Sequence, residues 1–158
     1  MLGGVGYRDM NEAMVAMPQK SWTGPLIALL EKEVTRPENA KDKEGVDKYR
    51  DQLFWQTTSA QVLGEIQAPE AVTPLMKVML DPNKADVAAT AILALVKIGK
   101  PAVDAASKLL AAEPTDSLAA WGLTRIKEAT KAKEPPKDKP YIAAAAIVLG
   151  TIRRPEAV

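Results

Sequence analysis

The side chains that most often carry out chemistry in proteins are scarce in this sequence. It contains no cysteine and no histidine, which removes disulfides, thiolate nucleophiles, the usual Ser-His-Asp arrangement and the commonest transition-metal ligand. Its glycines form no loop after a strand that could bind phosphate. We therefore expect that the chain is not an enzyme and that it needs no cofactor and no metal.

The charge gives no sign of a nucleic-acid or membrane partner. Lys and Arg number 21 and Asp and Glu 20, for a net charge of +1, so no global field attracts polyanions. The lysines within residues 127–139 are mixed with acidic residues and lack an aromatic neighbour that could stack on bases, which favours a solvated segment. The longest apolar stretch, residues 141–152, is about half the roughly 20 residues that span a bilayer. We expect no membrane span.

The three tryptophans are the remaining candidates for binding. Trp55 and Trp121 fall at apolar positions of predicted helices, so we expect both to pack between helices rather than to contact a ligand. Trp22 lies at the start of a predicted helix, and core packing and contact with a partner are equally good interpretations of it.

An internal repeat provides the elements that position these residues. Residues 62–72 and 148–158 are identical at eight of eleven positions. In addition, each of four isoleucines has a leucine three residues before it and a small residue seven residues before it. These isoleucines are Ile66, Ile98, Ile126 and Ile152. The three positions share one helical face, so each copy predicts the first helix of a helical hairpin. Gly64 and Gly150, at matched positions, predict close packing between helices.

A second helix follows most of the first ones. We expect second helices over about residues 22–34, 70–80 and 102–112, with prolines at the joints. Met14 and Met17 mark a weaker copy at the front. Two polar insertions, residues 35–48 and 127–139, interrupt the pattern, and the second is either a helical extension or a loop. The sequence predicts a single all-α array over residues 1–158, with four to five repeats.

The third copy has the fullest motif, in which Asp81-Pro82-Asn83 precedes the helix and Gly99 and Pro101 follow it. With this motif the chain resembles the HEAT repeat family, in the short bacterial form that is similar to the repeats of phycobilin lyases. The resemblance implies an armadillo-like α-α superhelix, a solenoid whose second helices line the concave, partner-binding face.

We therefore expect a scaffold or adaptor that binds a protein partner on the surface of its second helices. The outward positions there are Trp22, Thr73, Lys77, Asp104 and Lys108. HEAT-like repeats also form DNA glycosylases and other nucleic-acid-binding proteins, and a net charge of +1 speaks against that alternative. The likeness to lyase repeats suggests a third alternative, a bilin lyase-like chromophore chaperone.

The last residue, Val158, falls one turn into a predicted second helix and would leave an apolar face uncapped. Solenoids need polar caps, so we expect a fragment of a longer solenoid, or self-association through the C-terminal end. We expect a cytoplasmic location, or a periplasmic or secreted one if the parent chain carries a signal peptide.

Overall fold

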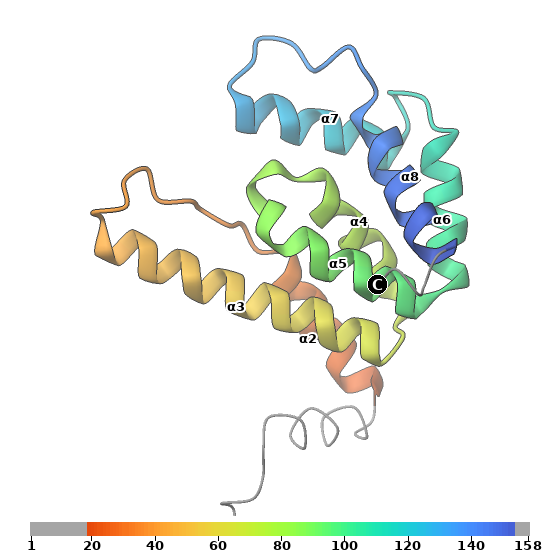
Figure 1. The fold of residues 1–158 in the computed structure, drawn as a ribbon, viewed down its shortest axis with the longest axis horizontal. Coiled ribbons are helices and arrows are strands. Elements are labelled where there is room, and N and C mark those ends of the chain that lie inside the picture. The colour runs from red at the N-terminus through yellow and green to blue at the C-terminus, as the bar shows by residue number, and fades with distance from the viewer. Residues whose placement is uncertain (1–18, 154–158) are drawn as a thin grey trace, which may run out of the picture.

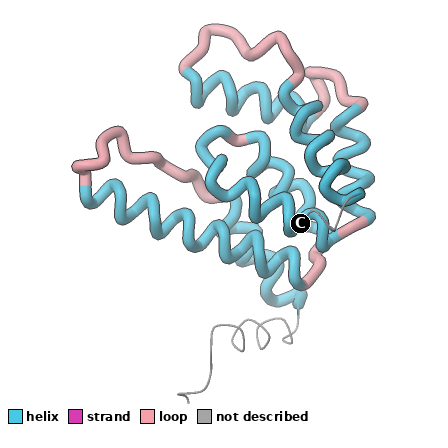
Figure 2. The backbone as a smooth tube through the Cα atoms, in the orientation of Figure 1, coloured by secondary structure: helices cyan, strands magenta, loops and turns pink. Residues whose placement is uncertain are grey.

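The computed structural model describes residues 19–153, which fold into helices joined by short turns and two longer loops (Figure 1). In chain order the elements are α2 (Gln19–Glu31), α3 (Lys43–Glu65), η1 (Pro69–Ala71), α4 (Val72–Leu80), η2 (Pro82–Lys84), α5 (Ala85–Ile98), α6 (Lys100–Leu110), α7 (Ser117–Thr130) and α8 (Pro140–Arg153). No strand occurs in this part of the chain (Figure 2). None of these helices has both the length and the apolar composition needed to cross a bilayer.

The predicted helices are present, with boundaries shifted by a few residues. The first helices of the four copies are α3, α5, α7 and α8, and the second helices are α2, α4 and α6. Residues 43–48 of the first polar insertion form the start of α3, where the Asp42 side chain accepts a hydrogen bond from the Gly45 amide at 3.0 Å. Residues 127–130 complete α7, and residues 131–139 are a loop. Met14, Met17 and Val158 lie outside the described residues.

Particular backbone conformations join the two helices of the hairpin formed by α5 and α6. Gly99 has φ +81° between α5 and α6, a left-handed conformation that costs glycine little. Pro101 follows in the first turn of α6, where its missing N–H leaves no hydrogen bond unmade. These two residues turn the chain tightly from a first helix to a second one.

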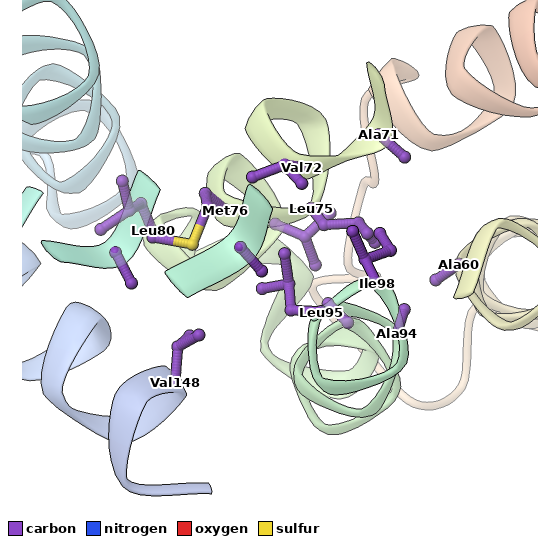
Figure 3. Packing of buried hydrophobic residues seen from close by; sticks show 14 of the residues in the cluster. Ala60, Ala71, Val72, Leu75, Met76, Leu80, Ala94, Leu95, Ile98 and Val148 are labelled. Carbon is purple, nitrogen blue, oxygen red and sulfur yellow. The ribbon is translucent and has the colours of Figure 1, made fainter. Parts of the chain in front are cut away.

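The first helices α3 and α5 pack closely because small residues meet at their contact. A Cβ at Gly64 would lie 2.7 Å from the Ala94 Cα atom, which leaves no room for a side chain. Ala60, one turn earlier on α3, is fully buried and points toward Ala94 and Ile98 (Figure 3). The packing predicted for Gly64 is confirmed. Gly150 differs, because no atom of the described residues lies within 4 Å of a Cβ placed there.

The second helices and α8 complete the core. Leu75 and Met76 of α4 are fully buried, and Val148 of α8 points toward the same apolar cluster (Figure 3). The Tyr141 hydroxyl donates a hydrogen bond to the Ala112 carbonyl at 3.1 Å, which ties the start of α8 to the end of α6. Apolar side chains from all seven helices α2 to α8 therefore form one continuous core.

One helix departs from the regular array. The repeat pattern places α7 beside α5 and α6, yet α8 takes that position, and α7 contacts α4, η2 and α8 instead. In Figure 1, α7 lies apart from the row formed by α3 and α5. The cause lies in residues 131–139, which are polar and proline-containing and cannot form an apolar second helix for α7 to pair with.

Trp55 corrects a second expectation, because it is 48% exposed rather than packed between helices. It lies nine residues before Gly64, or two and a half helical turns, so it faces away from α5. Its ring stands edge-on to Phe54, with 5.3 Å between the ring centroids. The helical register was predicted correctly, but the position of Trp55 lies opposite the α5 contact.

Candidate binding surface

The exposed surface of the second helices is formed by α4 and α6, with α7 lying across one end of it. On α4, Thr73 is exposed and Lys77 is half-buried one turn later. On α6, Asp104 and Lys108 are both exposed, and Asp104 forms an ion pair with Lys100 at 2.9 Å. Trp22 of α2 is half-buried and packs against the core. The structure therefore spreads the five predicted contact residues over three helices.

A groove of about 380 Å³ lies between α4, α6 and the start of α7. It brings together two of the predicted residues, Thr73 and Lys108, but not the other three. Five apolar side chains line it as well, Ala105, Leu109, Ala112, Leu118 and Ala119. An open apolar groove with a few polar groups at its edge is typical of a site that accepts an apolar side chain.

A second pocket of about 250 Å³ lies between the ends of α2 and α4 and the middle of α7. The predicted residue Lys77 lines it together with Trp121, and the Lys77 Nζ atom stands 5.2 Å from the centre of the Trp121 ring. Trp121 packs against the core, as its apolar position predicts. Its ring also carries a cation–π contact.

Arg125 holds α7 to the ends of α2 and α4. Its Nη2 atom lies 2.8 Å from the Asp81 carboxylate and 2.6 Å from that of Glu33. The Asp81 side chain is 2% exposed and that of Arg125 18%. Burial lowers the pKa of Arg125, but hydrogen bonds to Asp81 and Glu33 outweigh that effect and raise the pKa above its usual range. The guanidinium therefore stays charged, and it balances a buried carboxylate.

Lys84 is a buried lysine at the same pocket. Its Nζ atom donates a hydrogen bond to the Leu30 carbonyl at 2.6 Å, and only 6% of the residue is exposed. Burial lowers the pKa of Lys84, and the charges of Asp81 and Glu33 partly offset that effect. Since Leu30 lies in the last turn of α2, the ammonium group satisfies a carbonyl that has no partner within the helix.

A family model of HEAT repeats matches residues 56–124, from the middle of α3 to the middle of α7. This part of the chain belongs to the HEAT repeat family. No curated protein and no solved structure matches it. HEAT repeats commonly provide extended surfaces on which other proteins bind, and the groove lies on such a surface. The finer likeness to the repeats of phycobilin lyases stays a prediction.

The nucleic-acid-binding alternative gains no support from this surface, and the chromophore-chaperone alternative stays a prediction. A DNA-binding HEAT array needs a basic surface, yet Glu31, Glu33 and Asp81 line the pocket beside Lys77. Asp81, a buried carboxylate at this pocket, is paired with Arg125. Within residues 19–153, no group of three or more acidic side chains is arranged to hold a metal ion.

Arg125, Asp81 and Lys84 of this HEAT array were not predicted from the sequence as site residues. A partial signal is present, because Trp121 and Arg125 are one helical turn apart and share a face of α7. The partner Asp81 lies 44 residues away from Arg125. It becomes a neighbour only because α7 leaves its expected place, which no local pattern shows.

Replacing Lys84 with alanine should lower the free energy of unfolding of the HEAT array by about 1–3 kcal/mol, because the buried Leu30 carbonyl loses its donor. Urea unfolding followed by circular dichroism measures this loss. Lys108→Ala is the matched control and should change stability by less than about 0.5 kcal/mol, since Lys108 is exposed. Equal effects of the two variants would show that the Lys84 hydrogen bond adds nothing to stability.

Proposed function

We propose that this HEAT-repeat chain is a scaffold that binds a protein partner through the groove on its second helices. The observation that carries the proposal is the apolar lining of that groove, to which α6 contributes Ala105 and Leu109 and the turn after α6 contributes Ala112. Apolar surface of this kind gains free energy when a partner side chain covers it, at roughly 25 cal/mol per Å². Lys108 and Thr73 provide polar contacts at its edge.

The partner segment that suits this groove inserts an apolar side chain between α4 and α6. Asp104 lies one turn before Lys108 on α6, so it flanks the same surface. Lys77 and Trp22 lie farther along the second helices, and we propose them as contacts for a longer partner segment. Cytoplasmic location, self-association through the C-terminal end and membership of a longer solenoid stay predictions.

Site-specific photo-cross-linking tests this function. A photoreactive amino acid in place of Lys108, in the groove, should cross-link a defined protein in cells of the source organism. The same amino acid in place of Ala89, which is exposed on the first helix α5, is the matched control and should give no such product. Cross-linking of the same proteins from both positions, or from neither, would overturn the proposal.

A further inference from the structure

α7 lies on α4 through a small contact, beside which Leu118 and Trp121 are partly buried against the core. Only Ala119, Gly122 and Leu123 of its 14 residues are buried. A Cβ at Gly122 would lie 3.3 Å from the Leu80 Cβ atom, so the two helices touch closely at that point. A helix with so few buried apolar side chains belongs to the part of a fold that opens at the lowest free energy.

Charge provides the rest of the contact. We call Asp81 and Glu33 the acidic notch. Besides its Nη2 contacts with both carboxylates, Arg125 places its Nε atom 3.2 Å from Asp81, and its Nη1 atom lies 3.3 Å from Glu128 of α7 itself. Two carboxylates of the notch therefore contact the same guanidinium from different sides. Asp81 lies at the end of α4, and Glu33 lies just beyond the end of α2.

The shape of the notch selects arginine over lysine. A planar guanidinium offers several donors in fixed directions and can contact two carboxylates at once, which a single ammonium group does less well. The Trp121 ring lies 5.8 Å from the guanidinium carbon of Arg125, so an aromatic side chain one turn earlier adds a stacking contact. Trp121, Gly122 and Arg125 together form the pattern that fits this surface.

We propose that the acidic notch recognises an arginine-bearing helix of a protein partner, and that α7 is an internal occupant which such a helix displaces. The incoming helix carries an aromatic residue, a small residue next to it and an arginine four positions after the aromatic one. When α7 leaves, Leu118 leaves the wall of the groove, while the surface from α4 and α6 stays. One helix can then contact that surface and the notch together.

This inference deepens the proposed function and relies on it for the existence of a partner. α8 fills the place beside α5 and α6, while α7 adds Ala119 and Leu123 to the same core. The incoming arginine replaces Arg125 as the counter-charge of Asp81, so the carboxylate is not left buried without one. α7 therefore has the two properties of a competing internal ligand, a specific site and a low cost of leaving it. A partner can bind only the chains in which α7 has left the notch. Its apparent dissociation constant is therefore the intrinsic one divided by the fraction of such chains.

The test uses a fluorescent synthetic peptide of residues 115–131, which contains α7, and the full chain with Arg125→Ala. Loss of the guanidinium releases α7 from the notch, so the peptide should bind this variant at least tenfold more tightly than the unchanged chain, as measured by fluorescence anisotropy. A peptide with Arg125→Lys is the matched control and should bind at least fivefold more weakly than the unchanged peptide. Equal binding of the two peptides to the variant, or no binding to it, would overturn the inference.

Hydrogen exchange of the unchanged chain provides an independent measurement in case the variant folds poorly. The amides of α7 should exchange at least tenfold faster than those of α5, while α8 is protected like α5. Protection of α7 equal to that of α5 would contradict its release. Neither experiment uses the natural partner, so they can fail while cross-linking at Lys108 succeeds, and the inference and the proposed function are tested separately.

Discussion

Replacing Gly64 with alanine should lower the free energy of unfolding by about 1–3 kcal/mol, although alanine is the better helix former. The added Cβ would lie 2.7 Å from the Ala94 Cα atom, and a backbone atom cannot move aside as a flexible side chain can. The helices α3 and α5 would have to separate, and their apolar contacts would weaken. Urea unfolding followed by circular dichroism measures the loss.

Gly150 is the matched control, since it holds the same place in the repeat. No atom of the described residues lies within 4 Å of a Cβ placed there, so Gly150→Ala should leave stability unchanged or raise it by up to about 1 kcal/mol through helix propensity alone. Equal losses in both variants would mean that α8 packs against another helix through this face, contrary to the structure.

Replacing Val148 with aspartate should cost on the order of 4 kcal/mol or more and should remove most of the cooperative thermal transition. Val148 is fully buried in the core, and an unpaired carboxylate at such a place carries its whole desolvation penalty. Differential scanning calorimetry measures the effect. The size of the loss tests whether α8, rather than α7, completes the array.

Leu123→Asp is the comparison, because Leu123 is the largest buried apolar side chain of α7. This change should release α7 and leave the array folded, so the main transition should persist with a shift of only a few degrees. If Leu123→Asp abolished the transition and Val148→Asp did not, the assignment of the two helices would be reversed.

Much of the fold could be predicted from the sequence because its pattern is local. The Leu and Ile positions identified the four first helices within residues 19–153, and the close approach at Gly64 followed from a small residue on a buried helical face. Trp55 was placed incorrectly, because a repeat position marks a face only where a neighbouring helix covers it. The side of α3 that carries Trp55 is turned away from α5.

The position of α7 could not be predicted, for a physical reason. Its own residues have the same leucine and isoleucine spacing as the other first helices, so its local pattern indicates a regular place in the array. Two features outside α7 determine which helix packs beside α5 and α6. The polar loop after α7 provides no second helix for it to pair with, and Tyr141 and Val148 of α8 fill the place instead. The ion pair between Arg125 and Asp81 follows from that outcome, and so do the two pockets beside α7.

An engineered disulfide tests most directly the central claim that α7 lies on α4 and outside the array. The chain has no cysteine, so the pair Leu80→Cys and Gly122→Cys introduces the only two thiols, at Cβ positions 3.3 Å apart and close to disulfide geometry. Mild oxidation should link this pair nearly completely, as mass spectrometry of tryptic peptides would show. Leu93→Cys with Gly122→Cys would link if α7 lay beside α5. Linkage of that second pair and not of the first would contradict the account.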